Sequence, residues 1–210
     1  MTITKGVIML ESSASSHVFL IQSDENLLID TGNPGAFAAI WSELRSLGCD
    51  SIAHILLTHH DVDHIGNAQR LQEETGADVW ASGEDIPYIV GEKPRPGIKR
   101  IIQGILRPTP PRINGSYSGD QPFGDIRVIS APGHTPGHVM FLYRRVLFVG
   151  DLFAIKQGEL RLFPRFLTWN SQVVLESLAL LKTLEFEWLC PAHGHPLQRN
   201  DAVERFIRQY

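Results

Sequence analysis

The sequence predicts a single folded domain in which β-strands and α-helices alternate, and three observations support this. The chain has 210 residues, of which 43% are hydrophobic and 20% charged, close to the globular average. Short apolar runs typical of strands alternate with segments whose apolar residues recur at helical spacing. Residues with reactive side chains repeatedly follow the predicted strands, which places them together at one edge of a sheet.

In the first part of the chain, helices are predicted where apolar residues recur every three or four positions, at 37–47 and 65–75. Gly48 and Gly76 follow these segments and are expected to end the helices. Strands are predicted at 7–10, 18–22, 26–30, 52–58 and 79–81.

In the last part of the chain, the same alternation returns. Helices are predicted at 171–184 and 201–210, with Asp201 near the cap of the second. Arg144 and Arg145 are expected to form the turn of a hairpin. Strands are predicted at 125–130, 139–143, 146–149 and 186–190.

The segment 83–122 breaks this alternation and is predicted to be an insertion with one or two short helices inside a domain that spans 1–210. It holds seven of the 13 prolines, and the stretch 92–112 carries a net charge of +5. We expect this insertion to form a lid in which Arg95, Lys99 and Arg100 contact an anionic part of a substrate. The alternatives are a dimer contact or a plain solvated surface.

Charge and composition exclude several classes of protein. The net charge is −4, which argues against a general nucleic-acid binder. No apolar run approaches the roughly 20 residues that a membrane helix needs, and residues 1–11 do not resemble a secretory signal. The two cysteines, Cys49 and Cys190, cannot form a disulfide framework. We therefore expect a cytoplasmic protein with a small-molecule substrate and no nucleic-acid or membrane partner; a homodimer is compatible with the sequence.

The histidines are unevenly distributed. Seven of the nine lie in three short segments, and each segment follows a predicted strand: His59, His60, His64, His134, His138, His193 and His195. Histidine is the commonest metal ligand, and separate clusters can converge in a fold. The pattern therefore predicts a metal site.

Five motifs of the sequence resemble those of the metallo-β-lactamase superfamily, and they occur in the order typical of that family. The segment 58–66 is similar to the His-x-His-x-Asp-His signature, here in the variant form His-x-Asp-x-Asp-His. Three later segments of this chain resemble the remaining motifs of the family. They are Pro-Gly-His, which ends at His134, Gly-Asp, which ends at Asp151, and Ala-His-Gly, which contains His193. The early segment 28–32, which contains Asp30, resembles the strand and turn that precede the signature.

The resemblance implies an α+β fold, a four-layered αβ/βα sandwich of two mixed sheets flanked by helices, with two metal ions at the shared edge. It implies that the first metal is held by His59, Asp61 and His134, and the second by Asp63, His64 and His193. Asp151 would bridge the two ions. Asp30 is not a ligand in the family, and we expect it to fix the motif loop or a ligand imidazole.

Asp61 departs from the common pattern of the family, which has histidine at this position. A carboxylate here makes the metal centre less positive by one charge, so it acidifies water less. Oxygen ligands also favour harder ions. The family therefore implies two divalent ions with zinc as the first expectation, whereas Asp61 makes iron or manganese plausible.

The function that these residues imply is that of a metal-dependent hydrolase. A hydroxide bridging a dinuclear centre would attack a small ester, lactone or thioester, and Asp63 would orient it or accept a proton. One alternative is a di-iron redox enzyme directed at oxygen or sulfur, and another is a non-catalytic metal-binding protein. Glutathione thioesterases of the family carry a further C-terminal domain, so we expect a lactonase or small-ester hydrolase instead.

Overall fold

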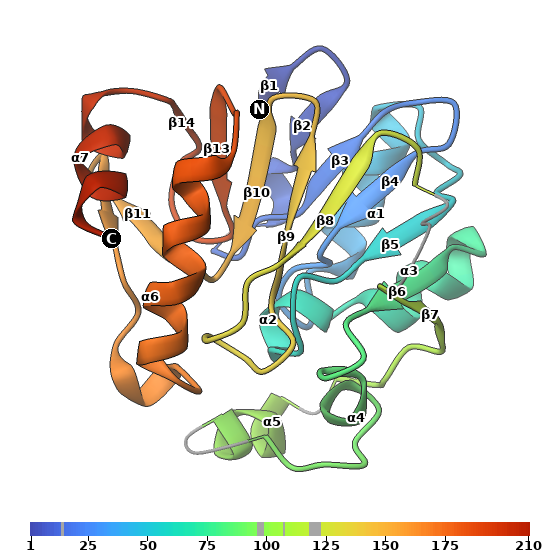
Figure 1. Cartoon of the computed structure of the whole chain (residues 1–210). Helices are drawn as coiled ribbons and strands as arrows, with labels where there is room; N and C mark the ends of the chain where they lie inside the picture. Colours follow the sequence, from blue (N-terminus) through green and yellow to red (C-terminus); the bar gives the residue numbers. More distant parts are fainter. Residues whose placement is uncertain (14, 96–98, 107, 118–122) are drawn as a thin grey trace. The chain divides into compact units, whose positions relative to one another are not determined.

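The computed structural model describes residues 1–13, 15–95, 99–106, 108–117 and 123–210, and the side chains of 102 and 103 also lie outside the description. Parts of the predicted insertion, 96–98, 107 and 118–122, therefore lie outside the described residues. The chain divides into two compact units, Met1–Gly119 and Asp120–Tyr210 (Figure 1). Each unit is built around one main β-sheet with its own helices, and each is described separately.

The first unit contains a seven-stranded mixed sheet whose strands follow the order of the sequence. The first four strands pair antiparallel and the last four parallel. The parallel strands matter for the site because their carboxyl ends lie at one edge of the sheet. The strands are β1 (Thr2–Thr4), β2 (Val7–Met9), β3 (Phe19–Ile21), β4 (Leu27–Ile29), β5 (His54–Leu56), β6 (Asp78–Ala81) and β7 (Ile113–Ser116).

Two helices pack on this sheet, α1 (Phe37–Ser46) and α3 (Ala68–Thr75), and they also contact each other. Each presents one apolar face to the sheet, and Ile40, Leu44 and Leu71 are fully buried there against strand residues. This spacing of three and four residues is the pattern that predicts an amphipathic helix. The short elements of the unit are η1 (Glu11–Ser13), α2 (Val62–Ile65), α4 (Ile86–Ile89) and α5 (Lys99–Leu106).

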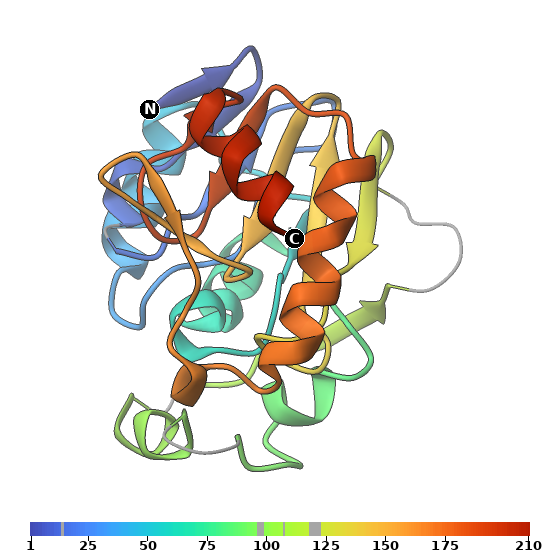
Figure 2. The same cartoon turned by 60° about the vertical axis from the view of Figure 1, so that its left-hand side comes forward.

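The second unit contains a five-stranded mixed sheet in the order β14-β13-β10-β9-β8. Helices α6 (Ser171–Ala179) and α7 (Asp201–Gln209) cover one face of it, and their buried residues Leu178 and Val203 join its core (Figure 2). The strands of the sheet are β8 (Ile126–Ser130), β9 (Val139–Tyr143), β10 (Val146–Gly150), β13 (Trp188–Pro191) and β14 (Leu197–Gln198). The remaining elements are β11 (Ala154–Lys156), β12 (Glu159–Arg161), η2 (Arg165–Leu167) and η3 (Leu180–Thr183).

These observations confirm the predicted fold class, an α+β arrangement of mixed sheets with flanking helices. Two details of the prediction were wrong. The helix predicted at 65–75 is two helices, α2 and α3, and the helix at 171–184 tightens into η3 after Ala179. Asp201 lies next to the N-cap of α7, as predicted, and the cap itself is Asn200, whose Oδ1 accepts hydrogen bonds from the first turn.

The insertion contains the two predicted short helices, α4 and α5, but it also contains a strand that was not predicted. The strand is β7, which pairs parallel with β6 and completes the first sheet. Gly115 explains why its sequence, Ile-Asn-Gly-Ser, was not recognised as a strand. A Cβ at Gly115 would collide with the Trp80 ring on β6, so the strand needs a residue that lowers ordinary strand propensity.

Candidate metal centre

The signature motif follows β5 as a tight turn into α2. Asp61 occupies the N-cap position of α2, and its carbonyl oxygen accepts the His64 amide at 3.0 Å. The turn brings the four candidate ligands together as two pairs. The Nε2 of His59 lies 3.5 Å from Asp61 Oδ2, and the Nε2 of His64 lies 3.8 Å from Asp63 Oδ2. The first unit therefore offers two imidazole–carboxylate pairs within one short segment.

Asp30 and Thr58 determine which nitrogen each of these two imidazoles presents. Asp30 Oδ2 lies 2.8 Å from His64 Nδ1 and also accepts the Thr58 hydroxyl at 2.7 Å. Because that hydroxyl has only one hydrogen, its oxygen must accept from His59 Nδ1, which lies 3.0 Å away. Both Nδ1 atoms thus carry hydrogen, and both Nε2 atoms keep a lone pair for a metal.

The loop that carries Asp30 is attached directly to the signature motif. The amide and hydroxyl of Thr31 donate to the carbonyl of His64 at 2.8 and 2.7 Å, and the Asn67 side chain donates back to the Thr31 carbonyl at 2.6 Å. A Cβ at Gly66 would collide with the backbone of this loop, so the close approach requires glycine. Asp30 itself has a φ of 59°, an uncommon conformation for a residue with a side chain, held here by two accepted hydrogen bonds from Thr58.

Lys99 of the insertion forms an ion pair with Asp61. Its Nζ lies 2.6 Å from Asp61 Oδ2, the same oxygen that faces His59, and Lys99 is only 8% exposed. The structure thus pairs a residue predicted to bind substrate with one predicted to bind metal. An ammonium at this oxygen reduces the negative charge that Asp61 would offer to a cation.

Arg95 is also buried, and its side chain binds the backbone of the signature motif. Its Nε donates to the His60 carbonyl at 2.9 Å, and it is 2% exposed. Burial lowers the pKa of Arg95, whereas the nearby Asp61, Asp85 and Asp63 raise it. The guanidinium of an arginine stays charged in such an environment. Arg95 therefore stabilises the turn of the motif through a carbonyl oxygen. Arg100, the third residue predicted to meet substrate, is exposed.

His60 contacts Asp85 through its Nδ1, while its Nε2 lies 3.6 Å from Asp61 Oδ1. Its Nδ1 lies 3.1 Å from Asp85 Oδ2, its amide donates to the same oxygen at 3.0 Å, and its ring stacks on Tyr88 with a centroid distance of 4.6 Å. Asp85 is fully buried and was not identified from the sequence. His60 thus connects the signature motif to the start of α4.

In the second unit, Asp151 lies between two histidines. His134 Nε2 is 3.4 Å from Asp151 Oδ2, and His193 Nε2 is 3.3 Å from Asp151 Oδ1, so each carboxylate oxygen faces one imidazole. Asp151 follows β10, His193 follows β13, and the two strands pair parallel, which brings their ends together. This is the arrangement expected of a carboxylate that bridges two ions.

His138 holds the Asp151 backbone in place. The Asp151 amide donates to His138 Nε2 at 3.1 Å, and His138 Nδ1 lies 3.0 Å from the Ala131 carbonyl. An amide can only donate and a carbonyl can only accept, so His138 is neutral with its hydrogen on Nδ1. Its role is to position the bridging candidate rather than to act as a ligand, and it is completely buried.

Phe163 packs against both histidines of the second unit. Its ring lies edge-on to His134 at a centroid distance of 5.0 Å and to His193 at 5.8 Å. The apolar ring restricts the rotation of both imidazoles. His195, two residues beyond His193, is exposed. The Cys190 thiol is fully buried, and burial raises its pKa, so it stays protonated and unreactive.

The donor set fits divalent transition metals. Two atoms bound to one tetrahedral ion at the usual zinc distances lie ~3.4 Å apart. Three of the histidine–carboxylate pairs have separations of 3.3 to 3.5 Å, and the fourth has 3.8 Å. Imidazole nitrogens mixed with carboxylate oxygens suit zinc, iron and manganese.

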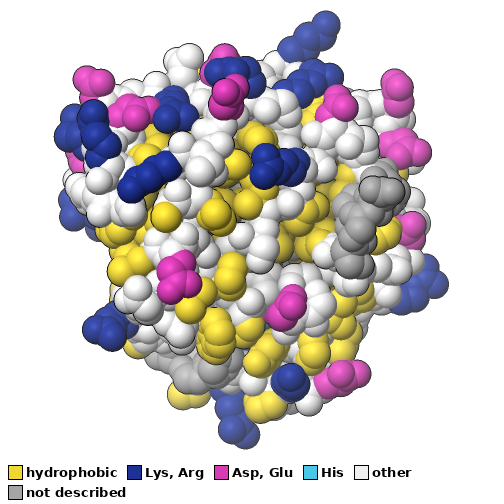
Figure 3. All heavy atoms as spheres, in the orientation of Figure 1, with side chains coloured by type: hydrophobic (Ala, Val, Ile, Leu, Met, Phe, Trp, Pro, Cys, Tyr) yellow, Lys and Arg dark blue, Asp and Glu magenta, His cyan; other side chains and the backbone are white. Residues whose placement is uncertain are grey.

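The face of the molecule drawn in Figure 3 carries both acidic and basic side chains, and no histidine is visible among the described residues on it.

The match to a known family decides the identity of this fold. Residues 14–193 match the model of the metallo-β-lactamase superfamily. The chain belongs to this superfamily. The matched segment includes all seven candidate ligands. Among the described residues, no helix has the length and apolar character needed to cross a membrane.

Curated relatives include metal-dependent hydrolases. The chain is 31% identical over 212 residues to the probable metallo-hydrolase YflN of Bacillus subtilis, covering 85% of this chain and 80% of the relative. It is 30% identical over 170 residues to a hydroxyacylglutathione hydrolase of Shewanella sp. (strain ANA-3), covering 78% of this chain. It spans only 58% of the length of that hydrolase. A hydrolase activity is therefore supported at the level of the superfamily and its relatives.

Solved structures show the same fold at low sequence identity. A motif mutant of a metallo-β-lactamase from Cronobacter sakazakii has a TM-score of 0.74 and 19% identity, covering 100% of this chain and 92% of that one. TTHA1623, solved in a di-iron-bound form, has a TM-score of 0.67 and 23% identity, covering 87% and 89%. These likenesses establish the metallo-β-lactamase fold.

Proposed function

We propose that the protein binds two divalent metal ions and is a binuclear metallohydrolase of ester-type bonds. His59, Asp61 and His134 would hold the first ion, and Asp63, His64 and His193 the second. Asp151 would bridge them. The observation that carries this proposal is the Asp151 carboxylate, whose two oxygens each face a different histidine at 3.3 and 3.4 Å.

The ligands proposed for each ion include residues of both units. The first unit offers two imidazole–carboxylate pairs, one for each ion. The second unit adds one imidazole to each ion and one shared carboxylate. A zinc ion in a catalytic site typically has three protein ligands and one open position. The combined set would give each ion four protein ligands, with the shared Asp151 included, so a water molecule would bind at a fifth position.

Two bound metal ions would lower the pKa of water and polarise a carbonyl group, which is the chemistry of hydrolysis. Residues of the chain would orient the metal ligands and transfer the proton. Asp30 and Thr58 hold the two imidazoles of the motif in one tautomer. Asp63, whose side chain is 26% exposed, is accessible to take a proton from an attacking water molecule and release it to solvent. Candidate substrates are small esters, lactones and thioesters.

Metal-dependent turnover tests this function. The purified protein would be stripped with a chelator, reloaded separately with zinc, manganese or ferrous iron, and assayed with 4-nitrophenyl butyrate, an aryl thioester and a simple lactone. We expect no turnover after stripping and restored turnover with at least one metal, because the nucleophile depends on the ions. Turnover that survives stripping, or none with any metal on any of the three substrates, would contradict the proposal.

A further inference from the structure

A pocket in the second unit begins at the candidate ligands His134 and Asp151. It has a volume of about 280 Å³, which is at the small end of the range for ligand sites. Its walls come from the end of β10, the segment before α6 and the first turns of α6. The pocket residues between 162 and 175 were not predicted to be functional, because this part of the sequence carries no recognisable motif.

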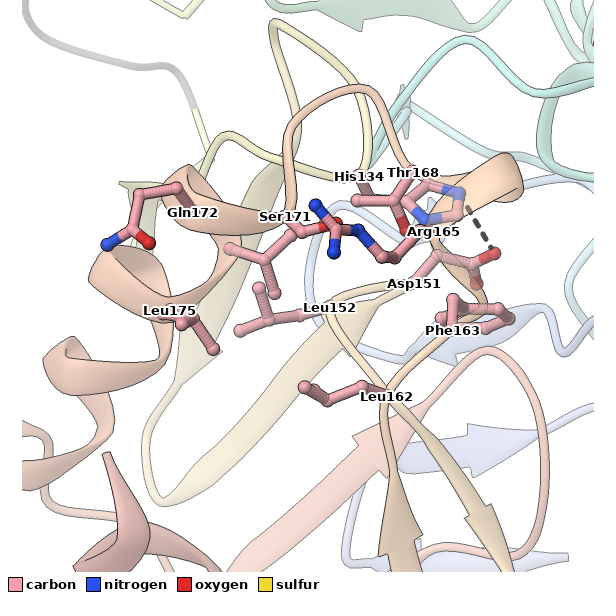
Figure 4. A pocket seen from close by; sticks show the side chains of 11 residues that line it. His134, Asp151, Leu152, Leu162, Phe163, Arg165, Thr168, Ser171, Gln172 and Leu175 are labelled. Carbon is pink, nitrogen blue, oxygen red and sulfur yellow. Dashed lines mark ion pairs between the residues drawn. The ribbon is translucent and has the colours of Figure 1, made fainter. Parts of the chain in front are cut away.

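The pocket combines an apolar wall with two oppositely charged side chains, Asp151 at the metal-ligand end and Arg165. Leu152, Leu162 and Leu175 form the apolar part, and Arg165 provides the only basic side chain among its lining residues. Figure 4 shows Arg165 extending into the pocket, with the leucines on one side and the His134–Asp151 pair on the other. A ligand that fills this space would carry an apolar segment and meet a guanidinium.

Arg165 has no acidic partner in the described part of the chain. The ion pairs recorded there for arginine involve four other arginines, at 45, 145, 199 and 205. Apart from Asp151, no residue that lines the pocket is acidic. A guanidinium is a planar fork of donors that matches a carboxylate, and such charge-assisted pairs are among the stronger hydrogen bonds. The hydroxyl of Ser171 lies in the same wall and offers a further donor.

The wall that carries Arg165 is attached to the metal-ligand loop. The Trp169 amide donates to the His134 carbonyl at 3.0 Å, and the Asn170 amide donates to the Gly133 carbonyl at 2.9 Å. The Asn170 side chain then caps α6 by accepting from two of its amides. The pocket is therefore held in a fixed relation to His134, so a substrate placed in it is also placed relative to that ligand.

We propose that this pocket selects substrates with a carboxylate at the end of a short apolar chain, such as half-esters of small dicarboxylic acids. The carboxylate pairs with Arg165, the methylenes contact the leucines, and the scissile carbonyl lies toward His134 and Asp151. This inference rests on the hydrolase function proposed above. Hydrolysis adds water across the acyl C–O bond and releases the dicarboxylic acid and the alcohol.

Matched chromogenic esters test the inference. The metal-loaded protein would be assayed with the 4-nitrophenyl half-esters of succinic, glutaric and adipic acid and with the uncharged 4-nitrophenyl butyrate. We expect kcat/KM for the best half-ester to exceed that for the butyrate by about tenfold, the size expected for one charge-assisted pair open to solvent. We expect R165M to reduce this ratio to near one and R165K to keep part of it.

Arg161 provides the matched control, because it is an exposed arginine on β12 that does not line the pocket. R161M changes the overall charge as much as R165M does, so it should leave the ratio unchanged. A ratio that survives R165M, or that R161M reduces equally, would overturn the inference and leave the hydrolase function standing. Absence of turnover on all four esters would also overturn the inference, and absence of turnover on the aryl thioester and the lactone as well would overturn the hydrolase function on which it rests.

Discussion

Replacing Asp151 with alanine is expected to remove most of the bound metal and to reduce turnover by about a thousandfold or more. Each oxygen of this carboxylate faces a different histidine, so one substitution removes a ligand from both proposed ions. Elemental analysis of the purified variant and ester turnover measure the two effects. Asp151→Asn keeps the shape of the side chain and should also lose metal, which separates loss of ligand charge from misfolding.

Asp125 is the control for this experiment, because it is an exposed aspartate of the same unit, just before β8. Asp125→Ala should keep both the metal content and the turnover of the unmodified protein. If Asp151→Ala and Asp151→Asn each retained two metal equivalents and full turnover, Asp151 would not be a ligand at all.

Replacing Lys99 with methionine is expected to strengthen metal binding at the position of His59 and Asp61 by about tenfold, or ~1.4 kcal/mol. The Lys99 ammonium lies 2.6 Å from the Asp61 oxygen that faces His59. A metal ion must compete with this ammonium for the same carboxylate, and methionine removes the competitor while preserving the apolar stem. Titration of the stripped protein with zinc against a chelating dye measures the affinity.

The same substitution should destabilise the stripped protein, because Asp61 would lose the ammonium that pairs with it in a buried position. Thermal unfolding with and without zinc distinguishes the two effects: Lys99→Met should lower the Tm of the stripped protein more than that of the loaded one. Arg100→Met is the control, since Arg100 is the exposed neighbour of Lys99. Equal or weaker zinc binding by Lys99→Met would show that Lys99 does not compete for Asp61.

The fold was largely predictable because its elements follow local rules. The strands at 139–143 and 146–150 are short apolar runs around a two-residue turn, and α1 has strict helical spacing. The elements that escaped prediction depend on tertiary contacts. In β7, Gly115 allows the Trp80 ring to pack closely against the strand. Such a contact between strands cannot be predicted from the local sequence pattern.

The candidate ligands were predictable because metal chemistry restricts the residue types and the family resemblance restricts their order. The residues that position these ligands were harder to predict from the sequence. Thr58 orients His59 through a hydroxyl, and Asp85 anchors His60 across 25 residues of sequence. Serines, threonines and aspartates are too common for such roles to stand out in one sequence. The ion pair of Lys99 with Asp61 likewise depends on where the insertion folds, which its charge alone does not specify.

The most direct test of the account is anomalous scattering from a crystal of the metal-loaded protein, measured at the absorption edge of the bound metal. The account predicts two peaks about 3.5–4 Å apart, one beside each oxygen of Asp151. The first peak should be coordinated by His59 and His134, and the second by His64 and His193. A single peak, or two peaks that do not share Asp151, would contradict the dinuclear centre on which the proposed hydrolase depends.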